Sequence, residues 1–131
     1  MVEKSKKIPR QGEIWLVKFE KMKENRKPFR PCLIISNDNQ NENDEAVIVS
    51  PLTTKEVIIG EIQPFEVPVS ASQETGLNED SWILFNRFHT VDKELRLIER
   101  LGKVDLKIWS QVQKAWWMVL TGEKTSGDKI N

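Results

Sequence analysis

The sequence predicts a mainly β domain, a barrel or roll of short strands followed by a single α-helix at its C-terminal end. Short segments rich in valine, isoleucine and aromatic residues alternate with polar stretches that contain proline, glycine and asparagine, the pattern of many short strands. From residue 106 the spacing of apolar residues changes to three or four, the period of one helix face. A chain of 131 residues has the usual length of one domain with its own hydrophobic core.

The first predicted strand covers residues 13–19 and carries apolar side chains on both faces. Ile14 and Leu16 face one way, and Val17 and Phe19 face the other, because successive side chains of a strand point to opposite sides. Two apolar faces suit a strand of a barrel.

The polar segment at residues 20–29 is predicted to be a long, mobile hairpin loop that leads to the second strand, residues 30–36. Residues 37–44 are then a run of Asn, Asp, Gln and Glu, whose side chains cap backbone groups in turns. We expect a solvated loop there, because the glycine and the ligand spacing of an EF-hand calcium site are absent.

Prolines mark the ends and edges of the next strands. The third strand, residues 46–52, is expected to end at Pro51, because proline has no N–H for a sheet ladder, and Thr53 follows at its mouth. A further strand within residues 61–69 contains two prolines, which favours an edge or bulged strand.

The C-terminal part is expected to complete the sheet and then form the helix. Residues 81–85 and 88–91 are predicted to be extended, and residues 95–104 to be the strand that closes the sheet. Asp105 is a suitable N-cap for a helix that ends before Gly122. The apolar residues at helical spacing, which should form its buried face, are Leu106, Trp109, Val112, Trp116 and Val119.

Composition excludes several kinds of site. Cys32 is the only cysteine, which excludes an internal disulfide and a multi-cysteine metal site, and its apolar neighbours predict a buried thiol rather than a nucleophile. With His89 as the only histidine, neither a histidine-rich metal site nor a Ser/His/Asp triad is visible. Twenty Lys and Arg balance twenty Asp and Glu, so any RNA binding must be local.

The charged residues 1–10 and the polar residues 121–131 are expected to be flexible tails around a folded domain at residues 11–120. No apolar run reaches the ~18 residues of a membrane span, and none follows the charged N-terminus as it would in a signal peptide. We therefore expect a cytoplasmic protein that needs no metal or other cofactor.

Four blocks of the sequence, in order, resemble the MazF/PemK toxin family over residues 11–120. The first, residues 12–17, is similar to the family's opening strand, and the second, residues 30–38, to its Arg-Pro-hydrophobic strand. The third, residues 47–53, is similar to the strand that ends in a catalytic threonine or serine. The fourth, residues 80–96, resembles the family's Asp-Ser, Thr-hydrophobic-Asp-Lys and Arg-Leu signature.

The resemblance implies an SH3-like barrel of the MazF/PemK/CcdB kind, a homodimer, and an antitoxin protein that blocks the RNA groove. It also implies a metal-independent endoribonuclease, an mRNA interferase, that cuts single-stranded RNA at specific sequences and leaves 2′,3′-cyclic phosphate and 5′-hydroxyl ends. By position, Arg30 and Thr53 would be the catalytic arginine and threonine. Without the resemblance, Arg30 would be a solvated residue paired with a carboxylate such as Glu24, and Thr53 a strand-end cap.

These residue types suit RNA cleavage. RNA supplies its own nucleophile, the 2′-hydroxyl, so the protein has to orient it, move protons and stabilise the charged phosphorane. The planar guanidinium of Arg30 matches a phosphate but is a poor base because its pKa is very high. The hydroxyl of Thr53 can donate a hydrogen bond to a phosphate oxygen.

The first loop differs from that of many family members because it contains no glycine. Its residues Lys23, Arg26 and Lys27 could contact phosphates, and Phe29 could stack on a base. A charged, solvated loop without any such role is an equally good interpretation.

The fourth block also differs, because Asn86, Arg87 and His89 replace an acid, a glutamine and an arginine of some relatives. If the strand is regular, Arg87 and His89 face the same side and might both line the RNA groove. His89 could act as a general acid near neutral pH, although a lone histidine in an apolar strand is more often structural.

Two other functions remain open from the sequence. The first is a toxin that binds a protein, like the gyrase poisons of related fold, which would use an exposed helix face around Trp117 and Met118. The second is a catalytically silent interaction module, against which the presence of both Arg30 and Thr53 argues.

Overall fold

The structure, a computed structural model, describes residues 7–19, 28–54 and 66–123. These residues form an antiparallel sheet with the strand order β4-β5-β3-β2-β1-β7, and β6 pairs with β3 off this path. The mainly β class with a C-terminal helix is confirmed. The elements are β1 (Glu13–Lys18), β2 (Phe29–Ile34), α1 (Asp38–Asn43), β3 (Ala46–Thr54), β4 (Glu66–Val69), β5 (Ser81–Leu84), the 3₁₀ turn η2 (Phe85–Arg87), β6 (His89–Asp92), α2 (Lys93–Arg96), β7 (Leu97–Lys103) and α3 (Leu106–Thr121).

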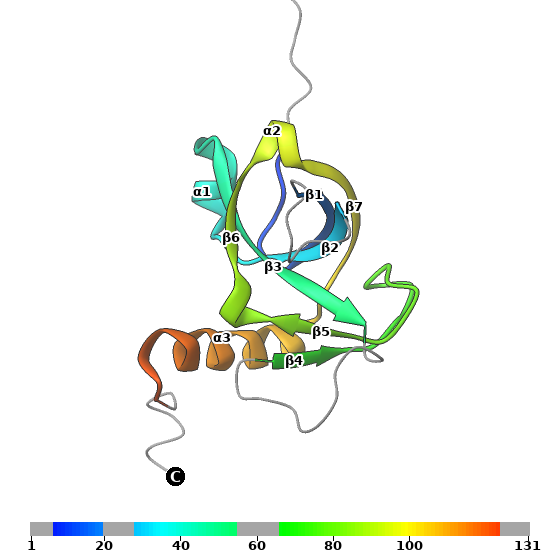
Figure 1. Ribbon diagram of the computed structural model, residues 1–131, viewed down its shortest axis with the longest axis vertical. Helices are drawn as coiled ribbons and strands as arrows, with labels where there is room; N and C mark the ends of the chain where they lie inside the picture. The colour runs from blue at the N-terminus through cyan, green and yellow to red at the C-terminus, as the bar shows by residue number, and fades with distance from the viewer. Residues whose placement is uncertain (1–6, 20–27, 55–65, 124–131) are drawn as a thin grey trace, which may run out of the picture.

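Five of the strands curl into a ring, and the other two carry the sheet away from it. Figure 1 shows β1, β2, β3, β6 and β7 around the ring, with α2 at its rim and with β4, β5 and α3 below. As the proline content predicts, β4 is an edge strand, because it pairs only with β5 in the described part of the chain.

The strand β3 belongs to both parts of the sheet and changes partners at Pro51. Up to that residue it pairs with β2 and β6, and from Leu52 onward it pairs with β5. The prediction that the strand ends at residues 51 and 52 is therefore wrong. Proline is tolerated where a ladder breaks because its missing N–H is not needed there, and the strand continues to Thr54.

Two hydrophobic clusters lie on opposite faces of the central strands. Inside the ring, Val17 and Phe19 pack with Cys32 and other small apolar residues. On the other face, Ile14 and Leu33 belong to a second cluster, which β4, β5 and α3 complete. This arrangement confirms that β1 has two apolar faces. We refer to the cluster inside the ring as the inner cluster.

Some local elements differ from the prediction. Residues 38–43, expected to be a loop, form the short helix α1, because Asn37 caps it through a bond from Gln40 N to its Oδ1. Residues 93–96 form α2 before the closing strand begins at Leu97. The helix α3 begins after Asp105, whose side chain accepts from Ile108 N.

The predicted buried face of α3 is confirmed except at Leu106, since Trp109, Val112, Trp116 and Val119 all contribute to the core. Val112 and Ala115 are buried in the cluster that β4, β5 and α3 complete, and Trp109 and Trp116 pack against this cluster. Leu106 is 86% exposed, because it lies in the first turn, before the helix reaches the sheet. No helix of the described residues is long and apolar enough to cross a membrane.

Two buried serines should respond in opposite ways to replacement by alanine. Ser50 Oγ is buried without a hydrogen-bond partner among the described residues, whereas Ser36 Oγ donates to Asn41 Oδ1 and accepts from Ile48 N. Because an unsatisfied buried hydroxyl is unfavourable, we expect Ser50→Ala to raise the free energy of unfolding by about 1 kcal/mol.

Ser36→Ala is the matched control for this prediction. It leaves a buried amide and a backbone N–H without their partner, so we expect it to lower the free energy of unfolding by about 1 to 3 kcal/mol. Urea denaturation of the two variants beside the wild type measures both changes. A loss of stability in Ser50→Ala as large as that in Ser36→Ala would contradict the prediction.

Candidate active site

Arg30 lies near the start of β2, on the strand face that lines the ring. It alternates with Cys32 and Ile34, both in the inner cluster, so the three side chains share one face. Arg30 Nη2 donates a hydrogen bond to the carbonyl oxygen of Leu52 at 3.1 Å. The half-buried guanidinium is thereby held between β2 and β3 at the mouth of the ring.

Thr53 lies on the neighbouring strand at the same end of the strand pair. In the antiparallel β2–β3 ladder, Cys32 pairs with Pro51. Arg30 lies two residues before Cys32 and Thr53 two residues after Pro51, so both lie on the same face as that pair and toward the same end of the two strands. Thr53 is half-buried and pairs across its other side with Trp82 of β5. The structure thus puts the predicted arginine and threonine on adjacent strands.

His89 reaches the mouth of the ring from a third strand. It pairs with Val49, a member of the inner cluster, and opposite residues of an antiparallel pair project from the same face. The imidazole lies against the ring of Phe19, with 5.1 Å between ring centroids and an interplanar angle of 53°. The pKa of His89 is lowered by partial burial first and by the positive charge of Arg30 second.

Asn86 and Arg87 lie in the 3₁₀ turn η2, and both side chains are exposed. The condition under which Arg87 and His89 would face the same side, a regular strand, is not met, because the chain leaves extended geometry at Phe85 and returns to it at His89. Arg87 nevertheless acts on the same site, since its charge contributes to lowering the pKa of Arg30.

The pKa of Arg30 is lowered mainly by burial, and the nearby charge of Arg87 adds to the effect. Cys32 acts in the opposite direction, but burial also raises the pKa of its thiol far above the usual range, so that thiol is neutral and structural, as predicted. No carboxylate of the described residues forms an ion pair with Arg30 or Arg87. Within the described part of the chain, no ion pair therefore neutralises the positive charges of Arg30 and Arg87.

The other predicted RNA-binding residues are placed differently. Phe29 is 47% exposed and pairs with Lys18, and it points to the face opposite to that of Arg30 because the two are consecutive in β2. The remaining predicted loop contacts and the carboxylate proposed as a partner of Arg30 lie outside the described residues. These are Lys23, Glu24, Arg26 and Lys27.

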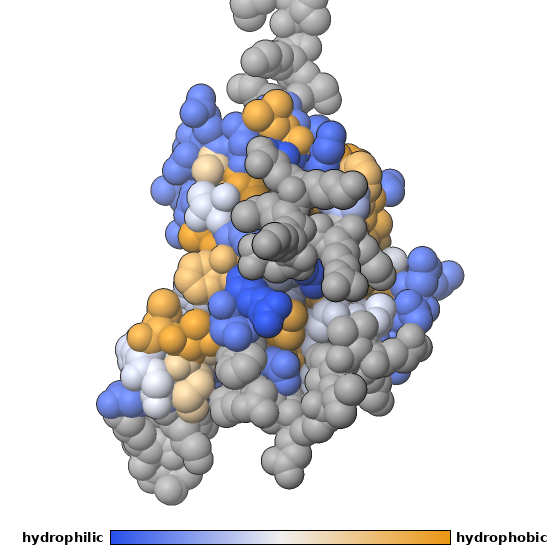
Figure 2. All heavy atoms as spheres, viewed as in Figure 1, coloured by the Kyte–Doolittle hydropathy of each residue, from blue (hydrophilic) through white to orange (hydrophobic). Residues whose placement is uncertain are grey.

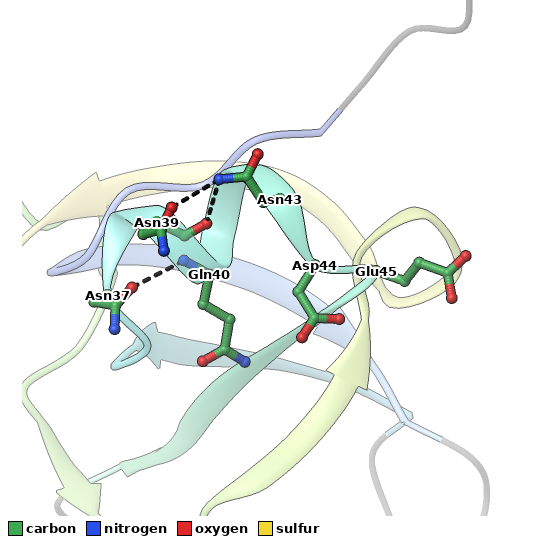
Figure 3. A pocket seen from close by; sticks show the side chains of 6 residues that line it. All are labelled: Asn37, Asn39, Gln40, Asn43, Asp44 and Glu45. Atoms are coloured by element: carbon green, nitrogen blue, oxygen red, sulfur yellow. Dashed lines mark hydrogen bonds between the residues drawn. The ribbon is translucent and has the colours of Figure 1, made fainter.

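A polar depression of about 520 Å³ lies at the other end of the β2–β3 pair, around α1. Figure 3 shows Asn43 Nδ2 donating to the side chain and to the carbonyl of Asn39, and Gln40 N donating to Asn37 Oδ1. Across the described ranges, no group of three His, Cys, Asp or Glu side chains is arranged to hold a metal ion. The depression is lined by Asn37, Asn39, Gln40, Asn43, Asp44 and Glu45.

The sequence assigned Phe19 only to the core, and its contact with His89 was missed. A signal was present, because Phe19 directly follows β1 and was predicted to share a face with Val17, but its partner comes from a strand seventy positions later. In Figure 2, hydrophilic side chains lie between the ring and α3, and a hydrophobic patch covers the C-terminal end of α3. Trp117 and Leu120 of that helix are 44% and 57% exposed.

Several solved structures share this fold. A mycobacterial endoribonuclease in complex with its cognate antitoxin has a TM-score of 0.70 at 20% identity, over 89% of this chain and 99% of that one. MazF from Deinococcus radiodurans has a TM-score of 0.69 at 19% identity, over 86% and 96%. The Mycobacterium tuberculosis toxin MazF-mt6 has a TM-score of 0.67 at 23% identity, over 82% and 95%.

Sequence comparison gives the family directly. A search of curated proteins finds no match. The family model described as PemK-like, MazF-like toxin of type II toxin–antitoxin system matches residues 10–118, which is most of the chain and includes Arg30, Thr53 and His89. The chain therefore belongs to the PemK-like, MazF-like family of toxins of type II toxin–antitoxin systems.

Proposed function

We propose that the protein is an endoribonuclease that cleaves single-stranded RNA at specific sequences, without a metal, at the mouth of the ring. The observation that carries this proposal is the Arg30 guanidinium, which is bonded to Leu52 O beside Thr53 and has no described carboxylate as a partner. A phosphate is the anion that suits such a group, because a guanidinium offers planar, paired N–H donors. Family membership and the mycobacterial endoribonuclease of the same fold support the choice of RNA.

The proposed reaction is an attack of the 2′-hydroxyl on the adjacent phosphorus. The P–O5′ bond breaks as the new P–O2′ bond forms, giving a 2′,3′-cyclic phosphate and a 5′-hydroxyl end. Arg30 stabilises the charge that grows on the phosphoryl oxygens, since donors held in place beforehand need no rearrangement during the reaction. Thr53 donates a second hydrogen bond to one of these oxygens, and exposed Arg87 binds a neighbouring phosphate.

We also propose that the protein acts in the cytoplasm as a homodimer and is inhibited by a cognate antitoxin protein. The complex of a mycobacterial endoribonuclease with its antitoxin supports this proposal. The antitoxin would cover the RNA-binding surface at the mouth of the ring.

The test is incubation of the purified protein with a long single-stranded RNA in excess EDTA, followed by mapping of the ends. We expect cuts at a restricted set of sequences with 2′,3′-cyclic phosphate and 5′-hydroxyl ends. Loss of cleavage in EDTA that added Mg²⁺ restores would exclude the metal-independent reaction. No cleavage of varied RNAs by folded protein would exclude the nuclease.

Thr53 offers a matched pair of variants for the same assay. Thr53→Val keeps the shape of the side chain but removes the hydroxyl, and we expect it to lower the cleavage rate by about a hundredfold. Thr53→Ser keeps the hydroxyl and should retain most of the rate. Equal rates in the two variants would show that the hydroxyl has no part in the reaction.

The exposed apolar end of α3 favours a second candidate function, a toxin that acts by binding another protein. Trp117 and Leu120 of this helix are exposed large hydrophobic side chains, which such a partner could contact. This function would not depend on Arg30. Growth inhibition by Arg30→Ala as strong as that by the wild type would favour it over the nuclease.

A further inference from the structure

We propose that His89 is a third catalytic residue of this chain, the general base that takes the proton from the attacking 2′-hydroxyl. This proposal rests on the proposed ribonuclease function and adds the proton acceptor that Arg30 and Thr53 do not provide. A threonine hydroxyl and a charged guanidinium are both poor bases at neutral pH, whereas a neutral imidazole is an effective one.

The position of His89 suits this role. It projects from the same face as Val49 of the inner cluster, and Arg30 lies on the corresponding face of β2, two positions from Cys32. The two side chains are close enough for the charge of Arg30 to act on the imidazole. A phosphodiester held by Arg30 would therefore present its ribose to the mouth of the ring, where His89 lies.

The imidazole is held in place but keeps its polar atoms available. The aromatic ring of Phe19 packs against the imidazole, with 5.1 Å between the two ring centroids. This contact limits rotation of the imidazole. Neither imidazole nitrogen hydrogen-bonds to a described residue, and the side chain is exposed. Among the described residues, no group therefore occupies the imidazole nitrogens of His89, and a ligand at the mouth of the ring can reach them.

The surroundings of His89 favour the neutral form, which is the form a base requires. The pKa of His89 is lowered by burial and by Arg30 of β2, and Arg87 of η2 adds a further positive charge to the site. The packed strand β3 contributes no ionisable side chain along Ala46–Thr54. The neighbour from β1 is Phe19, which carries no charge. At neutral pH the imidazole is thus unprotonated and can accept a proton.

The proton balance then assigns separate roles to the three groups. His89 takes the proton of the 2′-hydroxyl as the P–O2′ bond forms, and it becomes an imidazolium ion that later releases the proton to water. The departing 5′-oxygen receives a proton from water or from the Arg30 guanidinium, which then regains a proton from water. Burial and Arg87 lower the pKa of Arg30, which makes it a better proton donor than an arginine in water.

The first experiment compares the pH dependence of kcat/KM for the wild type and His89→Gln on the RNA substrate. For the wild type we expect the rate to rise with pH through the lowered pKa of His89 and to level off before neutrality. His89→Gln should lack this rise, lose about a hundredfold in rate at pH 7, and bind RNA nearly as tightly as before. Free imidazole should partly restore His89→Ala but should have no effect on Thr53→Val.

A second substrate separates a base from an acid. In RNA with sulfur in place of the bridging 5′-oxygen, the leaving group needs no proton, so loss of a general acid has little effect on its cleavage. We expect the defect of His89→Gln to persist on this substrate, and its disappearance would assign His89 as an acid instead. If the wild type cleaves RNA and His89→Gln cleaves it at a rate within twofold of the wild type, this inference alone is overturned. No cleavage by the wild type would overturn the proposed function as well.

Discussion

Arg30→Ala is expected to lower the rate of RNA cleavage by about a thousandfold, the largest effect of any single side chain at the mouth of the ring. The guanidinium is the group that we propose binds the phosphate, and its Nη2 donates a hydrogen bond to Leu52 O. Loss of one preorganised donor to a developing oxyanion slows an enzyme by about a hundredfold to a thousandfold, and Arg30 supplies two donors and a charge. Single-turnover cleavage at saturating protein measures the chemical step free of binding effects.

Arg30→Lys tests whether the shape of the group matters as well as its charge. Lysine keeps the positive charge but lacks the planar fork, so RNA binding should be largely retained while cleavage stays slow. The control is Arg100→Ala, which removes an exposed arginine bonded to Glu13 at 2.7 Å, away from the site. Wild-type rates in Arg30→Lys, or equal losses in the Arg100 variant, would contradict the role assigned to the guanidinium.

Gly76→Ala is expected to prevent stable folding. The backbone at Gly76 has φ of +71°, and a Cβ there would lie 1.9 Å from the carbonyl oxygen of Leu101 in β7. A rigid backbone atom cannot move aside as a flexible side chain can. The contact joins the turn before β5 to the closing strand, where Lys103 N also donates to Glu74 O. We expect a loss of more than about 4 kcal/mol, comparable with the whole stability of a small domain.

Gly122→Ala is the control that separates the steric clash from the backbone conformation. Gly122 ends α3 with φ of +73°, but a Cβ there would meet no atom within 4 Å. The left-handed conformation alone costs about 1 kcal/mol for alanine. Circular dichroism during urea denaturation should show a small shift for Gly122→Ala and an unfolded or strongly destabilised Gly76→Ala. Similar shifts of the denaturation midpoint in the two variants would mean that β7 can move away from a Cβ atom at position 76.

The long elements could be predicted from the sequence because their patterns are local. A run of β-forming residues with apolar side chains on both faces indicated β1, and an N-cap with helical spacing indicated α3. The helix α1 was missed because its six residues are all polar and lack an apolar period, so that only the cap at Asn37 marks it. The passage of β3 beyond Pro51 was missed because the change of partner strand depends on β5, which is distant in sequence.

The site could be predicted in part. Resemblance to the family singled out Arg30 and Thr53, and the structure places them on adjacent strands. The break between the extended segments at residues 86 and 87 was indicated, but the 3₁₀ turn that fills it was not, because so short a turn has no periodic pattern. The lowered pKa of His89 also depends on burial and on Arg30, and both are consequences of tertiary structure that a linear pattern does not contain.

The change of partners along β3 also limits how the fold can be divided. One continuous strand supplies Val49 to the inner cluster and Leu52 to the cluster under α3, and it leads directly to Thr53. A chimera that exchanges the β4–β5–α3 unit between relatives would have to join the two parents inside this strand. In such a chimera, residues of one parent would pack against residues of the other in both clusters, and Thr53 would be displaced. We therefore expect the two parts of this fold to evolve together rather than as exchangeable modules.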